Sequence, residues 1–417
     1  MKILHIADLH FGKSLHGRSL IDSGDQDFWV DRFLELAENE KPDAVVIAGD
    51  VYDRSAPSGE AVALFGRMLT GLADRRIPVL TVAGNHDSAK RLAFAGPLLA
   101  AQGVYISEPL TAPLLRHVTL QDAFGPVTFW LMPYVFPALI AQALGEEEIR
   151  SYDGAVRALL ARQPIDFSQR NVLIAHQNVT ANGAEVPRGG SETTVGGVGQ
   201  IDYTAFDGFD YAALGHIHAS YPVGRETVRY AGSPLCYHFD ELRQSEKGTL
   251  RVVLGEKGTK PAIDTLALPA LHPMREIRGS YEDLKAAGLA AEHRGEYLRV
   301  AVTDRRMAPE ILDFFRRLCE ERGSVLMECV SEYQAFREKG GEAAARTQER
   351  TLAELFGDFY TDRSGEVLSE KDEALLQAAA EELAGGLWRE DAKKAAESGA
   401  NALLALLLKQ EESHETA

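Results

Sequence analysis

Residues 44–50 read AVVIAGD, five consecutive apolar residues followed by a glycine and an aspartate. An unbroken apolar run of this length is typical of a strand buried on both faces of a parallel sheet. Further β-rich runs at residues 3–7 and 79–83 alternate with amphipathic stretches at residues 27–38 and 60–72. This βαβ rhythm predicts an α/β fold, in which polar residues that follow the strands gather at one edge of the sheet.

The second half of the chain adds more strands and then changes composition. Strands are expected at residues 172–175, 211–214, 228–231 and 250–254. A stretch rich in Gly, Pro and Lys at residues 255–273 then marks a boundary. We therefore expect a first domain over residues 1–265, a small α/β domain over residues 270–335 and helices over residues 345–410.

The formal net charge of −18 argues against non-specific binding to nucleic acid. Any nucleic-acid role must then use a local basic surface, bound cations or a basic partner. Residues 336–417 carry 18 acidic and 10 basic residues, a net charge of −8. Apolar residues between Leu375 and Trp388 form a stripe on the expected helices, which either packs on the chain itself or faces a partner.

The three cysteines show no paired spacing, so neither a disulfide framework nor a zinc knuckle is expected. That usage fits the reducing cytoplasm. The longest apolar stretches fall well short of a membrane span, and we expect no association with a membrane.

Five short polar motifs each follow one of the predicted strands. They are Asp8-Leu9-His10, Gly49-Asp50, Gly84-Asn85-His86-Asp87, His176 and Gly215-His216-Ile217-His218. Each motif is common by itself, and the alternative is that they are ordinary turn residues with incidental histidines. Their shared position after strands favours a single site at the sheet edge.

These residue types predict a metal centre. Imidazole nitrogens with carboxylate and carboxamide oxygens, and no thiolate, suit manganese, iron or zinc. The ligands are too many for one ion, and two ions about 3.5–4 Å apart are the usual device for displacement at phosphorus. We expect Asp8, His10, Asp50 and His218 at the first position and Asp50, Asn85, His176 and His216 at the second, with Asp50 bridging.

His86 stands beside a ligand in the same turn and is not needed for coordination. We expect it to protonate the leaving oxygen, with Asp53 or Asp87 fixing its tautomer. The alternative is that it only supports the ligands by a hydrogen bond.

The motif array resembles the calcineurin-like metallophosphoesterase superfamily, and more narrowly its SbcD-type branch of DNA double-strand-break repair nucleases. The segments that carry the narrower resemblance are residues 8–13 (DLHFGK), 15–20 (LHGRSL), 49–54 (GDVYDR), 213–218 (ALGHIH), 230–235 (YAGSPL) and 239–241 (FDE). The resemblance implies a two-sheet β-sandwich flanked by helices, a small α/β capping domain and a C-terminal helical segment.

It also implies the activity and the partners. The branch cleaves DNA with two Mn²⁺ ions, as a 3′–5′ exonuclease on duplex ends and an endonuclease at hairpins and single strands, in repair and recombination. The helical segment implies docking to an SbcC-type coiled-coil ATPase. A homodimer is implied too, giving a two-plus-two heterotetramer. Leu64, Leu69, Leu92, Leu98 and Leu99 are candidate dimer contacts or plain core residues.

The candidates for DNA contact are cations near the motifs. They are Lys13, Arg18, Lys90, Arg91, Arg188 and Arg225, and the alternative is that they are ordinary solvated surface residues.

Two other functions stay open. A protein or small-molecule phosphatase of the same superfamily would use Arg54 to clamp a phosphoryl group, but such enzymes carry Glu where this chain has Asp87. A non-catalytic DNA-end scaffold would be expected to lack a ligand.

Overall fold

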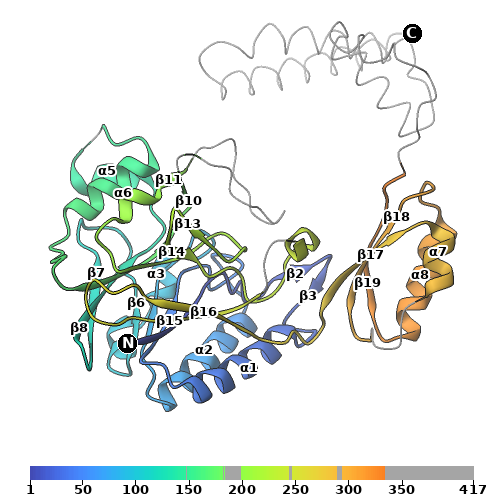
Figure 1. Ribbon diagram of the computed structural model, residues 1–417, viewed down its shortest axis with the longest axis horizontal. Coiled ribbons are helices and arrows are strands. Elements are labelled where there is room, and N and C mark those ends of the chain that lie inside the picture. The colour runs from blue at the N-terminus through green and yellow to red at the C-terminus, as the bar shows by residue number, and fades with distance from the viewer. Residues whose placement is uncertain (147, 182, 184–198, 244–246, 289–293, 334–417) are drawn as a thin grey trace, which may run out of the picture. The chain divides into compact units, whose positions relative to one another are not determined.

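The computed structural model in Figure 1 describes residues 1–333 apart from residues 147, 182, 184–198, 244–246 and 289–293. Residues 1–333 form one unit. The helices expected over residues 345–410, with their apolar stripe, lie outside the described residues. No helix in the described part of the chain combines the length and the hydrophobicity needed to span a bilayer.

The first sheet contains the strands of the opening βαβ pattern. Its order is β16-β15-β1-β4-β5-β6. The bounds are β1 Lys2–Ile6, β4 Ala44–Ile47, β5 Val79–Thr81, β6 Val104–Ile106, β15 Gly248–Val253 and β16 Ala262–Ala267. Strands β1, β4, β5 and β6 are parallel, whereas β15 and β16 are added antiparallel. The residues that follow β1, β4 and β5 therefore meet at one edge.

The second sheet also has six strands, in the order β13-β14-β12-β9-β8-β7. The bounds are β7 Arg116–Asp122, β8 Gly125–Met132, β9 Arg170–His176, β12 Tyr211–Gly215, β13 Tyr221–Val223 and β14 Arg225–Tyr230. Strands β8, β9, β12 and β14 are parallel, with β7 and β13 antiparallel at the two ends.

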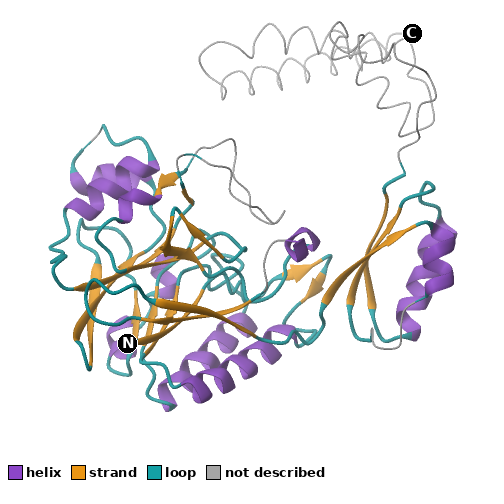
Figure 2. Ribbon diagram, in the orientation of Figure 1, coloured by secondary structure: helices purple, strands orange, loops and turns teal. Residues whose placement is uncertain are grey.

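The two sheets pack on each other through a shared apolar core. Ile3 and Val46 of the first sheet belong to the same fully buried cluster as Phe129 and Val172 of the second. Helices lie on both sides of the strands (Figure 2). The predicted two-sheet sandwich flanked by helices is confirmed.

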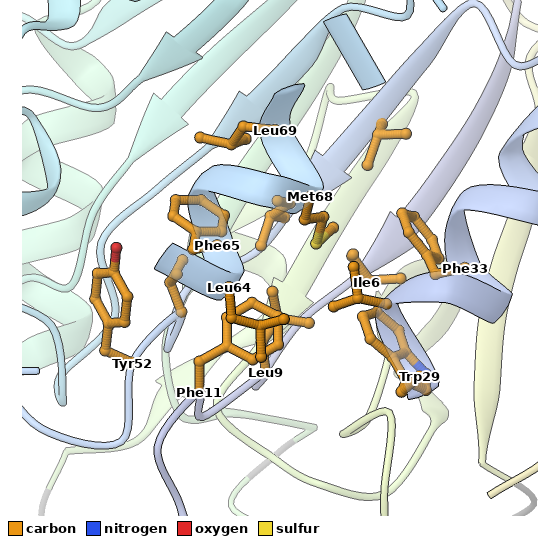
Figure 3. Close-up of a cluster of buried hydrophobic side chains, with 14 of the residues drawn as sticks. Ile6, Leu9, Phe11, Trp29, Phe33, Tyr52, Leu64, Phe65, Met68 and Leu69 are labelled. Atoms are coloured by element: carbon orange, nitrogen blue, oxygen red, sulfur yellow. The ribbon is translucent and has the colours of Figure 1, made fainter. Parts of the chain in front are cut away.

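Four longer helices cover the outer faces. They are α1 Asp25–Glu40 and α2 Gly59–Asp74 on the first sheet, and α5 Pro137–Leu144 and α6 Tyr152–Ala161 on the second. Figure 3 shows how α1 and α2 bury Trp29, Phe33 and Met68 against Ile6 of β1. The α2 helix begins after Ser58, whose hydroxyl accepts a hydrogen bond from the amide of Ala61.

The five leucines considered for a dimer interface divide unequally. Leu64, Leu69 and Leu92 are buried in the core under the first sheet, and Leu99 packs against it. Leu98, on α4 (Gly96–Ala100), is 75% exposed. The core alternative therefore describes four of the five.

A small α/β layer follows the sandwich. Its parallel sheet has the order β17-β18-β19, with β17 Met274–Gly279, β18 Tyr297–Val302 and β19 Val325–Ser331. Helices α7 (Tyr281–Ala287) and α8 (Pro309–Glu321) connect these strands and bury Val300, Ile311 and Phe315. We call residues 274–331 the capping layer. The remaining short elements are β2 Ser14–Leu15, β3 Arg18–Ser19, α3 Ala89–Leu92, β10 Val179–Thr180, β11 Ile201–Asp202, η1 Tyr203–Phe206 and η2 Phe239–Arg243.

One buried carboxylate joins the capping layer to the sandwich. Asp25, at the start of α1, is 3% exposed. Its carboxylate accepts hydrogen bonds from the Tyr297 hydroxyl at 2.6 Å and from the Ser23 hydroxyl at 2.6 Å. The His272 ring nitrogen Nδ1 lies 3.1 Å away. A buried charge with several donors is stable, and removing one donor leaves part of that charge unsatisfied.

We predict that Tyr297→Phe lowers the free energy of unfolding by about 1.5–3 kcal/mol, since it removes a hydrogen bond to a buried charged group. Urea denaturation followed by circular dichroism measures the change. Tyr333→Phe is the control, because that side chain is 43% exposed. Equal unfolding midpoints for the two variants would contradict the prediction.

Candidate metal centre

All seven predicted ligands lie at the carboxyl edges of the two sheets. Asp8 and His10 follow β1, Asp50 follows β4 and Asn85 follows β5. His176 ends β9, and His216 and His218 follow β12. Ligand atoms within 4.8 Å of one another form three groups: Asp8 with His10 and His218, His10 with Asp50 and His86, and Asp8 with Asp50 and His176. The structure thus brings together side chains that are as much as 210 positions apart in the chain.

The backbone is strained where the ligands leave the strands. Asp8, His10, Asp50 and His216 have positive φ angles of 55°, 43°, 48° and 104°. Such conformations cost non-glycine residues of order 1–3 kcal/mol each and cluster at functional sites. Gly84 is needed for a different reason, since a Cβ there would lie 2.1 Å from Oδ1 of Asp50.

On the first side of the site, two imidazole nitrogens face each other. Nε2 of His10 lies 3.2 Å from Nε2 of His218 and 3.6 Å from Oδ2 of Asp50. Nδ1 of His218 donates a hydrogen bond to the Glu241 carboxylate at 3.1 Å, since a carboxylate only accepts. In the neutral ring Nε2 of His218 then carries the lone pair and faces the pocket, as a metal ligand requires.

On the second side, oxygens and nitrogens converge around Asn85. Its Oδ1 lies 3.0 Å from Nε2 of His176 and 3.0 Å from Nδ1 of His216. Nδ1 of His176 donates to the carbonyl of Ala48 at 2.8 Å, and its Nε2 lies 3.3 Å from Oδ2 of Asp50. Because this imidazole has hydrogen-bond acceptors at both nitrogens, it is held as the cation in the metal-free pocket.

Burial and neighbouring charges shift the pKa values of three of the candidate ligands. Burial raises the pKa of the Asp8 carboxyl to about 7, against the pull of His176. Burial also acts to raise the pKa of Asp50, but His176 and the other histidines outweigh it and hold that pKa below its usual range. Burial would lower the pKa of His176, yet the Asp50 carboxylate raises it to about 9. The pocket thus holds protons where cations would bind, and its donor set fits divalent ions.

Two further histidines stay neutral near pH 7. Burial lowers the pKa of His10 to about 4 and that of His216 to about 3. Neutral imidazole is the form that binds a metal ion.

His86 is held by main-chain contacts. Its Nδ1 donates to the carbonyl of Asp53 at 2.9 Å, and its amide donates to Oδ1 of Asp50 at 2.9 Å. Of the two residues expected to fix its tautomer, Asp53 is the one in contact, and it acts through its main-chain carbonyl. The Asp87 carboxylate instead accepts from the amides of Val51, Tyr52 and Gly84, and so holds the two loops together.

The candidate DNA contacts lie in different settings. Lys13 donates to the Asp53 carboxylate at 2.9 Å, so its charge is already paired. Arg18 lies over the Tyr297 ring, 5.9 Å from its centroid. Lys90 and Arg91, on α3, are exposed, and Arg91 donates to the carbonyl of Ser55.

The two remaining candidates for DNA contact are Arg225 and Arg188. Arg225 donates to the carbonyl of Phe206 at 2.7 Å, a contact within the sandwich. Arg188 lies outside the described residues.

Two residues without an expected role, Glu241 and Lys247, lie behind His218. Glu241, on η2, is fully buried and contacts His218. Lys247 donates to the same carboxylate at 2.7 Å. Burial would raise the pKa of Glu241, but the His218 hydrogen bond and the Lys247 charge lower it to about 2. Glu241 belongs to the segment FDE at residues 239–241, which carries the family resemblance, but no periodicity gives it a role, because η2 and the residues after it form an irregular segment.

Comparison with known proteins gives two family matches. A family described as calcineurin-like phosphoesterase matches residues 1–220, and one described as type 5 capsule protein repressor C-terminal domain matches residues 270–364. The SbcD subunit of the SbcCD nuclease from Staphylococcus epidermidis is 31% identical over 307 residues, 73% of this chain and 79% of that protein. The SbcD subunit from Staphylococcus saprophyticus is 31% identical over 301 residues, 72% of this chain and 77% of that protein.

We predict that the affinity for Mn²⁺ rises between pH 6 and pH 8, because an ion must displace protons from Asp8 and His176. The rise should approach about tenfold per pH unit for each proton released. Titration calorimetry in buffers of different ionisation enthalpy measures both the affinity and the proton count. Affinity independent of pH, with no proton release, would show that these groups do not hold the protons.

Proposed function

The chain belongs to the SbcD family of SbcCD nuclease subunits, within the calcineurin-like phosphoesterases, and from this membership we propose that it is the nuclease subunit of an ATP-dependent DNA end-processing complex. It is a metal-dependent nuclease. We propose 3′–5′ exonuclease action on duplex ends and endonuclease action at hairpins and single strands. The observation that supports a dimetal nuclease is the convergence of all seven candidate ligands, with none missing; the polarity and the hairpin activity are proposed from the family alone.

The proposed metals are two Mn²⁺ ions, since the donor set combines hard oxygens with imidazoles and contains no thiolate. Divalent ions in such a site lower the pKa of a bound water and neutralise phosphate charge. The protein's own contribution is to hold the ligands in place before DNA binds: five of the seven are buried, and four have positive φ angles.

The proposed role of His86 is to protonate the leaving oxygen of the cleaved strand. The Asp53 carbonyl holds the proton on Nδ1. Nε2 is then the ring nitrogen that can take up and release a proton. The side chain is half-buried beside His10, at 4.8 Å between ring centroids, so it is close to the ligands and still reachable by substrate.

The proposed partner is an SbcC-type coiled-coil ATPase that docks on residues 345–410, which lie outside the described residues. The net charge of −8 over residues 336–417 suits a protein partner better than DNA. The two staphylococcal relatives are named as subunits of SbcCD, which implies such a complex for those proteins. We further propose a homodimer. It is supported by two exposed apolar side chains at the short helices α3 and α4: Phe94 is 80% exposed and Leu98 is 75% exposed.

A phosphatase of the same superfamily is the second candidate. It would need an arginine fixed beside the metals, and Arg54 is 82% exposed with its Nε 3.9 Å from the Asp53 carboxylate. The chain therefore offers no fixed clamp at that position, which favours the nuclease.

We predict that His86→Ala lowers the rate of DNA cleavage about 10²–10⁴-fold, because general acid catalysis is lost. Both Mn²⁺ ions should still bind, since His86 is not among the ligands. Single-turnover cleavage and calorimetry measure the two quantities, with the exposed His117→Ala as the matched control. Loss of a metal from the His86 variant would reassign His86 as a ligand or support.

The substrate class is tested on the purified chain with Mn²⁺. We predict that a blunt DNA duplex labelled at its 5′ ends is shortened from the 3′ ends, and that the ATPase partner with ATP increases the rate. A phosphopeptide should remain intact over the same time. Efficient turnover of the phosphopeptide alone would favour the phosphatase, and binding of DNA ends without cleavage would favour the scaffold.

A further inference from the structure

Behind the metal centre lies a buried acid that the proposed reaction does not use. Glu241 sits on the single turn η2 and has no exposed surface. Its Oε1 accepts from Nδ1 of His218 at 3.1 Å. Its Oε2 accepts from Nζ of Lys247 at 2.7 Å and from the amide of Tyr237 at 3.1 Å. A carboxylate buried this deeply is stable only because donors surround it.

The two carboxylate oxygens of Glu241 accept hydrogen bonds from different donors. Oε2 accepts from the Lys247 ammonium and the Tyr237 amide, which can only donate, and more weakly from the Ser233 hydroxyl at 3.4 Å. That arrangement leaves Oε1 for His218, and its charge holds the proton of that imidazole on Nδ1. In the neutral ring Nε2 of His218 then carries the lone pair, and this nitrogen lies 3.2 Å from Nε2 of His10. This is the tautomer that binds a metal ion through Nε2.

The same Lys247 also fixes the main chain of the ligand. Its ammonium donates to the carbonyl of His218 at 2.8 Å and to the hydroxyl of Ser233 at 2.7 Å. His218 is therefore held at its ring and at its backbone by one connected set of charged groups.

The second side of the site is built differently. His176, its counterpart there, donates its Nδ1 proton to the carbonyl of Ala48, which is neutral. A histidine backed by a carboxylate is a more basic ligand than one backed by a carbonyl. The two metal positions therefore differ in the electrostatic support of their histidines.

We propose that Glu241 is a positioning residue that keeps His218 in its metal-binding tautomer, and that the position served by Asp8, His10, Asp50 and His218 therefore binds its ion more tightly than the other. The inference rests on the dimetal site proposed above. It concerns the free protein as well, because the tautomer is set before an ion binds.

Glu241→Gln is the decisive variant because it keeps the shape of the side chain. Lys247 and the Tyr237 amide draw the amide oxygen to the Oε2 position, which turns the amide nitrogen toward His218. Nδ1 of His218 must then accept a hydrogen bond, and its proton moves to Nε2, where it blocks coordination. Glu241→Asp keeps the charge and should retain the parent tautomer in part.

The first measurement is ¹⁵N NMR of the histidine side chains in the metal-free full chain. We expect His218 to be protonated at Nδ1 in the parent and at Nε2 in Glu241→Gln. Protonation at Nε2 in the parent itself would overturn the proposal, and this result does not depend on whether a variant folds.

The second measurement is Mn²⁺ titration by calorimetry. In Glu241→Gln the affinity of the tighter Mn²⁺ site should fall about 10–100-fold. The affinity of the weaker site should stay within about twofold of its value in the parent. DNA cleavage should recover at saturating Mn²⁺, because the defect is in binding. Asp240→Asn is the matched control, since it neutralises a carboxylate that lies on the same turn and is 50% exposed. Unchanged tight binding in Glu241→Gln would overturn the proposal.

The two measurements separate this inference from the proposed function. If the parent chain bound fewer than two Mn²⁺ ions, the dimetal nuclease proposal would fail. The tautomer of His218 would still report on Glu241 alone.

Discussion

The buried carboxylate of Asp50 is the interaction on which the site depends. Oδ2 of Asp50 lies 3.6 Å from Nε2 of His10 on one side and 3.3 Å from Nε2 of His176 on the other. Its Oδ1 accepts from the amide of His86 and leaves no room for a Cβ at residue 84. Such a group is costly to bury and to strain, so the folded sandwich must supply the free energy that keeps it there. The large apolar core shared by the two sheets has that capacity.

The sequence was sufficient for most of the parallel strands and for the residues at their edge, for a simple physical reason, whereas β16 lies inside the stretch 255–273 that was expected to be a boundary. Strands buried on both faces read as unbroken apolar runs, and their carboxyl ends must meet, so polar residues after them gather without any knowledge of distances. Helices α5 and α6 were not anticipated. The α5 stretch, PALIAQAL, is nearly all apolar and shows no polar face. The role of each side chain as a ligand, and the choice of Mn²⁺, stay predictions.

What the sequence could not supply is the support behind the ligands. Asp53 contributes a backbone carbonyl to His86, and no side-chain pattern encodes a main-chain acceptor. Glu241 reaches His218 from an irregular turn 23 residues further along, where neither a period of two nor one of 3.6 applies. Positive φ angles at Asp8 and Asp50 are equally invisible in composition. These features arise from tertiary packing, so they became visible only in three dimensions.

The turn η2 contacts the metal centre on one side and the capping layer on the other. Its inner side carries Glu241 against His218. On its outer side Arg243 pairs with Glu276 of β17 at 2.6 Å, and Asp240 lies 3.5 Å from Arg299 of β18. Exposed ion pairs contribute little each, but these two sit on a segment only five residues long. A displacement of the capping layer must either break both pairs or move the turn that holds Glu241. The capping layer and the turn that holds Glu241 are therefore joined by two ion pairs at the surface.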